Sequence, residues 1–191
     1  CTTHNRELWV ARFGRVIDRM QIDQYGILYH DLVSAVRAGI PKRVERVCGT
    51  VAAIETSAER QIVRVRDGET VDARLIILAN GLNRALQQSL GITYATLSPF
   101  HSTTIGFDVV SHDKAGLAFD SLTYYGENPN DRTAYLTLFK LGETVRANLM
   151  TYREAKDPWL QAFRDTPKST LLDLAPNLAP LLGDFSVAGP I

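Results

Sequence analysis

Residues 75–92 read LIILANGLNRALQQSLGI. The opening five residues are continuously apolar, which is typical of a strand covered on both faces in a parallel sheet. Asn80 and Gly81 then form a turn, and a helix is expected over about 82–90, closed by Gly91. Open α/β sheets bind ligands beside such turns, and amide groups at a helix start favour anions. The same order of elements also suits a plain tight connection, so the pattern alone leaves both interpretations open.

The residues before this stretch predict a hairpin, a helix and further strands. Two short apolar runs over 8–22, on either side of Phe13-Gly14, favour a β-hairpin. Apolar residues then recur every three or four positions over 24–38, which predicts an amphipathic helix that Asp23 can cap. Three strands are expected after this helix, over 46–55, 61–66 and 70–79, with a tight Asp67-Gly68 turn between the last two.

The second half of the chain has the pattern of an antiparallel sheet. Strands are expected over 103–110, 122–126, 132–141 and 144–152. Alternation would place Tyr135, Thr137 and Phe139 on one face of their strand. Two short helices are expected near the end, after Asp157-Pro158 and Thr166-Pro167, because proline suits the first turn of a helix.

Composition narrows the class of protein. The 191 residues are 45% apolar and 22% charged, as in soluble globular proteins. Lysine and arginine together number 21, and so do aspartate and glutamate, so the formal net charge is zero. The chain as a whole therefore does not attract nucleic acid electrostatically. No apolar run approaches the roughly 18 residues of a transmembrane helix. The two cysteines lack the spacing of a disulfide framework or a zinc site, so a cytoplasmic location is expected. The four histidines are too scattered in the sequence to indicate a metal site.

The stretch over 75–92 resembles part of the FAD-dependent monooxygenases of the para-hydroxybenzoate hydroxylase type. In that family a strand ends in Gly-Ala-Asp-Gly before a helix that finishes in Leu-Gly-Ile, and the preceding elements occur in the same order. Flavin-dependent halogenases and isoprenoid-chain reductases share this plan. The resemblance implies an α/β fold: residues 1–95 from an FAD/NAD(P)-binding, glutathione-reductase-like domain, and residues 96–191 from a β-rich, antiparallel-sheet substrate domain with C-terminal helices.

The resemblance also implies cofactor-binding residues. Asn80 and Gly81 match the family's Asp-Gly pair, although the neutral amide of asparagine supplies hydrogen bonds and no charge. Tyr29 stands where that family commonly has an arginine near the flavin. Val51 stands where main-chain groups lie against the adenine.

The implied activity is hydroxylation of a small organic substrate, with FAD, oxygen and NADH or NADPH as reductant. His101, Tyr124 and Tyr135 are candidates to line the substrate pocket, although an aromatic residue on an alternating strand more often belongs to the core and a lone histidine more often lies on the surface or is hydrogen-bonded. No catalytic residue is assigned. Because no G-x-G-x-x-G occurs, the resemblance implies an incomplete fragment of a longer flavoprotein. Halogenation, isoprenoid-chain reduction and a non-catalytic ligand-binding domain remain alternatives, and the oligomeric state stays open.

Overall fold

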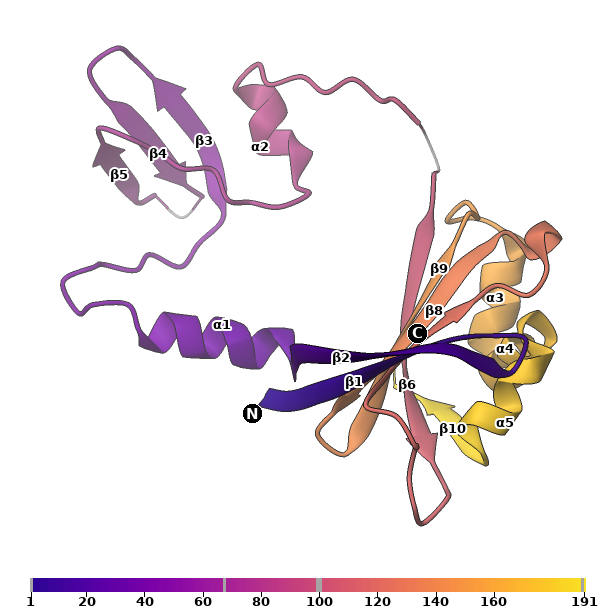
Figure 1. The fold of residues 1–191 in the computed structure, drawn as a ribbon. Helices are drawn as coiled ribbons and strands as arrows, with labels where there is room; N and C mark the ends of the chain where they lie inside the picture. The colour runs from indigo at the N-terminus through magenta and orange to yellow at the C-terminus, as the bar shows by residue number, and fades with distance from the viewer. Residues whose placement is uncertain (1, 67, 99–100, 190) are drawn as a thin grey trace. The chain divides into compact units, whose positions relative to one another are not determined.

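The computed structural model describes residues 2–66, 68–98, 101–189 and 191. The chain divides into two compact units (Figure 1). The large unit comprises Cys1–Gly39 and Ser98–Ile191, and the small unit comprises Ile40–Leu97. The boundary expected at residue 95 lies close to the end of the small unit. The first 39 residues, in contrast, belong with the C-terminal half, because their first strand joins its sheet.

The large unit contains a seven-stranded sheet with the order β10-β6-β9-β8-β7-β1-β2. Its strands are β1 (Thr2–Arg12), β2 (Arg15–Ile27), β6 (Thr103–Ser111), β7 (Ser121–Tyr125), β8 (Thr133–Leu141), β9 (Thr144–Thr151) and β10 (Phe185–Ala188). Neighbours are antiparallel except β1 and β7, which are parallel. The four strands predicted over 103–152 are confirmed. However, β6 pairs with β9, so only β7, β8 and β9 form a simple meander.

The N-terminal hairpin is confirmed and is longer than predicted. Its turn has positive φ at Phe13 (51°) and Gly14 (69°), and the pairing continues to Thr2 opposite Ile27. The following helix, α1 (Tyr29–Ala38), therefore starts later than the predicted 24–38. The expected cap by Asp23 is wrong, because that residue lies within β2 and Leu28 occupies the cap position.

Helices cover one face of the large sheet (Figure 1). They are α3 (Pro158–Asp165), α4 (Pro167–Leu174) and α5 (Ala179–Leu182), with 3-10 turns η1 (Pro129–Asp131) and η2 (Pro176–Leu178). The core lies between sheet and helices and includes Leu122, Leu138, Leu149, Phe163 and Leu171. Burying such side chains stabilises each by about 1.5–3 kcal/mol. Both C-terminal helices begin at the predicted prolines.

The opposite face of this sheet carries polar and aromatic side chains. On β8, Leu136 and Leu138 are buried in the core, whereas Tyr135, Thr137 and Phe139 alternate with them on the other side, as predicted. Ser121 and Thr123 share that side on the paired strand β7. We call the side defined by Ser121, Thr123, Thr137 and Phe139 the open face.

The small unit contains an antiparallel sheet and one short helix. The strands are β3 (Val51–Thr56), β4 (Gln61–Val65) and β5 (Thr70–Ala73), and the helix is α2 (Arg84–Ser89). The hairpin predicted between β4 and β5 is confirmed, with Gly68 at φ 98°. Its other predicted turn residue, Asp67, lies outside the described residues.

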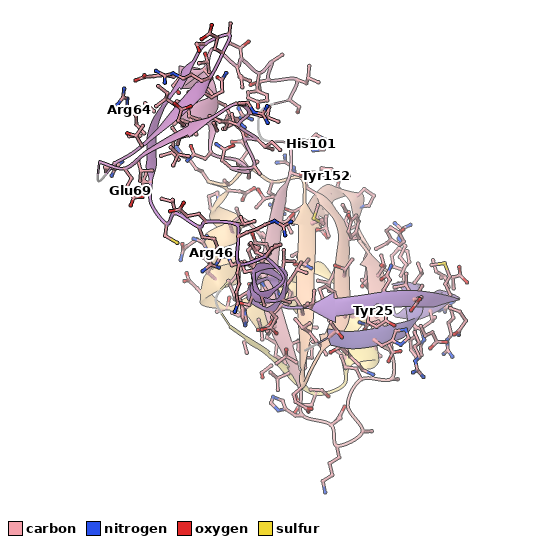
Figure 2. All side chains as sticks on the ribbon, turned by 90° about the vertical axis from the view of Figure 1, so that its left-hand side faces the viewer. Tyr25, Arg46, Arg64, Glu69, His101 and Tyr152 are labelled. Carbon is pink, nitrogen blue, oxygen red and sulfur yellow. The ribbon has the colours of Figure 1, made fainter. Side chains whose placement is uncertain are left out.

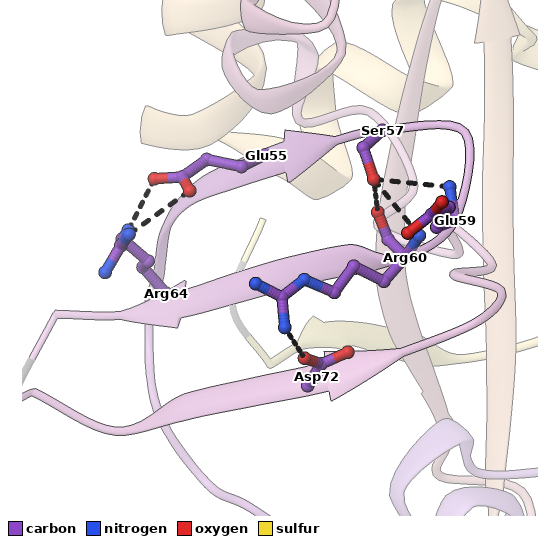
Figure 3. A network of polar contacts seen from close by, with 6 residues as sticks. All are labelled: Glu55, Ser57, Glu59, Arg60, Arg64 and Asp72. Atoms are coloured by element: carbon purple, nitrogen blue, oxygen red, sulfur yellow. Dashed lines mark hydrogen bonds and ion pairs between the residues drawn. The ribbon is translucent and has the colours of Figure 1, made fainter.

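The charged side chains of the small sheet are paired across strands (Figure 3). The guanidinium of Arg64 donates to both carboxylate oxygens of Glu55, at 2.6 and 3.2 Å, and this hydrogen bonding lowers the pKa of Glu55. Arg60 donates to Asp72 at 3.1 Å. These strands therefore carry a mixed-charge, exposed surface.

The apolar run at 75–79 is the main departure from the predicted fold. It contains no strand, and Leu75 and Ile77 are 75% and 81% exposed. Ile76 and Leu78 are half-buried and line a cavity of about 260 Å³ with Ile54. The prediction of a strand buried in a parallel sheet is wrong here. A parallel strand needs hydrogen-bonded neighbours, and no strand among the described residues pairs with this run.

Candidate functional site

The turn predicted to approach a cofactor is held by its own side chains. Asn80 Nδ2 donates to the carbonyl of Asn83 at 2.8 Å, and Asn80 Oδ1 accepts from Gln87 Nε2 at 3.2 Å. Gly81 is exposed with φ 58°, and no heavy atom lies within 4 Å of where a Cβ would stand. The side chain of Asn80 therefore fixes the turn, while the backbone at Gly81 is open to approach.

The helix after this turn is shorter than the predicted 82–90 and is already capped. Asn83 Oδ1 accepts a hydrogen bond from Ala85 N at 3.2 Å, which satisfies one of the free amides at the start of α2. The helix has six residues and ends before Gly91, whose φ is 75°. The amide donors expected to favour an anion are thus partly used within the chain.

The other two predicted cofactor residues lie in different units. Val51 begins β3 opposite Val65, in the same small unit as Asn80 and Gly81. Tyr29 begins α1 in the large unit and is largely exposed. The structure therefore brings three of the four predicted positions into one unit.

The predicted substrate residues all lie in the large unit and are spread over it. His101 is exposed, and its ring makes an edge contact with Tyr152 at a centroid distance of 5.9 Å (Figure 2). Tyr135 lies on the open face, where its ring contacts Tyr125 at 6.4 Å. His101 and Tyr152 lie just outside the ends of β6 and β9, whereas Tyr125 and Tyr135 lie on β7 and β8.

Tyr124 is a correction to the predicted pocket. It is 2% exposed and lies in the core, on the side of β7 opposite Ser121 and Thr123. Its hydroxyl donates to Glu127 and accepts from Gly14 N. Burial, followed by the hydrogen bond to Glu127, raises the pKa of Tyr124 well above its usual range. The residue therefore supports the fold and does not line the open face.

A cavity of about 520 Å³ is lined by the N-terminal hairpin and by strands β7 and β8. From the hairpin it is lined by Asn5, Leu8, Gln24, Tyr25, Gly26 and Ile27. From the sheet it is lined by Ser121, Leu122, Thr123, Thr137, Leu138 and Phe139. Its volume lies in the range of small-molecule sites, about 300–1,000 Å³. Because Leu122 and Leu138 point into the core, the sheet side chains available to a ligand are those of the open face.

The free end of the hairpin is anchored over the β8–β9 turn, which shapes this cavity. Asn5 Nδ2 donates to the carbonyl of Lys140 at 3.3 Å, and Gly142 N donates to Thr3 Oγ1 at 2.6 Å. A Cβ at Gly26 would stand 2.8 Å from the Lys140 carbonyl, so glycine permits this close approach. The ring of Tyr25 stacks on that of His4, with the ring centroids 4.5 Å apart. Tyr25, which Figure 2 labels, is 59% exposed.

Asp120 connects the hairpin to the sheet beside the cavity. Its carboxylate accepts from Arg6 N at 3.0 Å and from Lys140 Nζ at 3.2 Å. The backbone hydrogen bond from Arg6, followed by that from Lys140, lowers the pKa of Asp120. The negative charge of Asp120 is thus held by hydrogen bonds between the hairpin and the sheet. None of the described residues that line the cavity is charged.

The sequence interpretation missed the hairpin's part in this site. Asn5 and Leu8 were assigned to the first domain, and the pairing of β1 with β7 depends on contacts far apart in sequence. One signal was present in residues 121–125, SLTYY, where small polar residues alternate with larger ones. That alternation separates Ser121 and Thr123 from Tyr124.

The described ranges contain neither a membrane-spanning helix nor a metal-binding cluster. No helix in them combines the length and apolar composition needed to cross a bilayer. No group of three or more histidine, cysteine, aspartate or glutamate side chains in them could hold a metal ion.

Comparison with known proteins identifies a shared fold. Neither a family model nor a curated protein matches the sequence. The p-nitrophenol 4-monooxygenase PnpA from Pseudomonas putida DLL-E4 has a TM-score of 0.64 at 13% identity, over 98% of this chain and 50% of its own. The flavin-dependent brominase Bmp2 has a TM-score of 0.64 at 14% identity, over 99% of this chain and 49% of its own.

The halogenase PltM, crystallised with phloroglucinol and FAD, has a TM-score of 0.62 at 13% identity, over 99% of this chain and 42% of its own. The chain therefore spans about half the length of the structures it matches, or less. It has a mixed α/β fold, with a large and mostly antiparallel sheet, that is also found in a monooxygenase and in halogenases.

Proposed function

We propose that this chain is part of an FAD-dependent oxidoreductase. The observation that carries the proposal is the extent of the structural match: it covers 98–99% of these residues, including both units, in PnpA and Bmp2. Bmp2 is described as flavin-dependent, and PltM was crystallised with FAD. The exposed apolar side of Leu75 and Ile77 also supports a longer protein, whose further strands would cover them.

The turn at 80–81 fits a large dinucleotide in one respect. The space beside Gly81 is open, so its backbone can make a close contact that a side chain would block. We assign contacts to FAD in the small unit to Gly81 and to the backbone at Val51, and we keep the exposed Tyr29 of the large unit as a separate candidate contact. Asn80 acts as a positioning residue, since its amide holds the turn. When bound, the flavin would supply the redox chemistry of the reaction.

The substrate site is assigned to the cavity on the open face. There the side chains of Leu8, Ile27 and Phe139 exclude water, and the hydroxyls of the open face orient a small molecule. Tyr135 lies on this face, and His101 belongs to the same unit, so both remain candidate substrate contacts. The substrate contacts are thus assigned to the large unit, and the contacts to FAD at Gly81 and Val51 to the small unit.

Two reactions fit this arrangement. The first is hydroxylation of a small organic substrate with oxygen and NADH or NADPH, and PnpA, a monooxygenase of the same fold, supports it. The second is halogenation, which is supported by the match to PltM and Bmp2. The two reactions are distinguished by the group that is added to the substrate.

The test uses the longest protein that contains these residues, reconstituted with FAD and supplied with NADH or NADPH, oxygen and a panel of small aromatic compounds. Mass spectrometry of the products, with and without bromide or chloride, separates the reactions. We expect a product that gains one oxygen atom and does not depend on halide. Halide-dependent replacement of hydrogen by halogen would establish the alternative. A protein that binds no FAD and consumes no reductant would contradict both.

A further inference from the structure

Asn80 is the only asparagine in the sequence that is followed by glycine. In such a pair the backbone nitrogen of the glycine can attack the side-chain carbonyl carbon of the asparagine, because the second residue has no Cβ to block the approach. The pair lies in the turn before α2, where Gly81 is exposed with φ 58°. The turn therefore presents a side chain that can react with its own backbone.

The backbone nitrogen of Gly81 is available for this attack. Its N–H donates no hydrogen bond to any of the described residues. Apart from its chain neighbours, no described heavy atom lies within 4 Å of where a Cβ of Gly81 would stand. An N–H that is exposed and unpaired can lose its proton to hydroxide, which makes the nitrogen nucleophilic.

The amide of Asn80 is held by one donor and one acceptor. Gln87 Nε2 donates to Asn80 Oδ1 at 3.2 Å, on the oxygen where negative charge develops when the nitrogen attacks. Asn80 Nδ2 donates to the carbonyl of Asn83 at 2.8 Å, and this bond must break before ammonia can leave. One such hydrogen bond slows a reaction by a factor of about two to ten, so it does not prevent the attack.

Asn83 provides an internal comparison. It is exposed, whereas Asn80 is half-buried, so exposure alone would make Asn83 the more reactive asparagine. However, Arg84 follows it and carries a Cβ, and Asn83 Oδ1 accepts from Ala85 N at 3.2 Å as the cap of α2. The local geometry thus favours reaction at Asn80 over Asn83.

We propose that Asn80 is a site of spontaneous deamidation. The bond between Gly81 N and Asn80 Cγ forms, the Cγ–Nδ2 bond breaks, and Nδ2 leaves as ammonia with the proton that Gly81 N gives up. Water then opens the cyclic imide at either of its two carbonyl groups, which yields aspartate or isoaspartate at position 80. Water is the only co-reactant, and the inference does not rest on the proposed function.

The reaction would change the turn in two ways. A carboxylate cannot donate to the carbonyl of Asn83, so the hydrogen bond from Nδ2 is lost and a negative charge takes its place. Isoaspartate also adds one carbon to the backbone immediately before Gly81. Deamidation would therefore loosen the connection that leads into α2.

Incubation of the whole chain in mildly alkaline buffer, without flavin, tests the proposal. Peptide mass spectrometry measures the replacement of NH2 by OH at each asparagine, and methylation by protein isoaspartyl methyltransferase measures isoaspartate. We expect both products at position 80, formed about tenfold or more faster than any product at Asn83. The rate should rise with pH, because Gly81 N must lose its proton. Unfolding the chain in urea should accelerate the reaction at Asn80 by no more than about tenfold.

Two glycine variants test the role of the missing side chain. Gly81→Ala places a Cβ beside the attacking nitrogen and should slow deamidation at Asn80 several-fold. Gly91→Ala is the matched control, because Gly91 also has positive φ and open space, and it should leave this rate unchanged.

The proposal is overturned if Asn80 keeps its amide, if Asn83 reacts as fast, if aspartate forms without isoaspartate, or if the two glycine variants behave alike. The comparison of Asn80 with Asn83 uses the unaltered chain, so it stands even where a variant fails to fold. None of these measurements depends on whether the protein binds FAD.

Discussion

The hydroxyl of Tyr124 donates to Glu127 Oε1 at 2.5 Å. The same hydroxyl accepts from Gly14 N at 3.0 Å, at the turn of the N-terminal hairpin. Glu127 in turn accepts from the backbone N of Asn177 at 3.1 Å, beside the helical layer. One buried tyrosine therefore connects the hairpin, the sheet and the helices of the large unit.

Tyr124→Phe should lower the free energy of unfolding by about 1 kcal/mol, because it removes the hydrogen bonds that a buried hydroxyl makes with Glu127 and Gly14. Urea denaturation of the chain measures this change. Tyr125→Phe is the matched control, since Tyr125 is the next residue of β7 and is 43% exposed. Its unfolding free energy should change by less than about 0.5 kcal/mol. Equal effects of the two substitutions would contradict the assignment of Tyr124 to the core.

Asp120 should make the stability of the large unit depend on pH in the acid range. Its pKa is lowered in the folded state from the ordinary 3.8, so its contribution is complete above about pH 5 and is lost as the pH falls through the folded pKa. Asp120→Asn should lower the unfolding free energy near neutral pH by about 1 kcal/mol and should flatten its decrease in acid.

Denaturation curves measured over a range of pH test this prediction. Glu143→Gln changes an exposed carboxyl in the β8–β9 turn and serves as the control. An Asp120→Asn protein with the same acid dependence as the unaltered chain would show that the junction with Arg6 and Lys140 contributes nothing measurable.

Ile76 and Ile77 are adjacent isoleucines, but Ile76 should contribute more to the free energy of unfolding than Ile77. Ile76 is half-buried against the small sheet, whereas Ile77 is 81% exposed. In this chain Ile76→Thr should lower the unfolding free energy by about 1 kcal/mol, and Ile77→Thr by less than about 0.5 kcal/mol. Thermal unfolding of both variants provides the comparison. Equal losses of about 1 kcal/mol in both variants would instead support the strand covered on both faces that the sequence predicted.

Gly81→Asn tests the assignment of the turn to FAD. Asparagine tolerates positive φ, so the substitution fills the open space with less backbone strain than a β-branched residue would introduce. We expect the affinity for FAD to fall about tenfold, a loss of roughly 1.4 kcal/mol. Gly91→Asn is matched to it, because Gly91 also has positive φ and open space, at the other end of α2. Equal losses of FAD affinity in the two variants would argue against a contact at Gly81.

The sequence predicted the sheet of the large unit well, because alternation along a strand is a local property. The pattern of Tyr135, Thr137 and Phe139 against Leu136 and Leu138 identified both faces of β8. The hairpin turns at Phe13-Gly14 and near Gly68 were also evident, since positive φ favours few residue types.

The errors arose where distant contacts decide the structure. An apolar run such as 75–79 forms a strand only when it is hydrogen-bonded to another strand. The composition of the run does not show whether such a neighbouring strand is present. The sequence predicted Tyr124 in a pocket because an aromatic residue on a strand suits either face of a sheet. Which alternate residues of β7 face the core decides between the two faces. Asn5 was missed because its position depends on the carbonyl of Lys140, which lies 135 residues away in sequence.

The most direct test of the central claim is a flavin titration of the longest protein that contains these 191 residues. After incubation with FAD and gel filtration, the visible absorbance that elutes with the protein measures the bound cofactor. The account predicts stoichiometric FAD in the protein fraction. Protein that elutes colourless after every reconstitution would contradict the account.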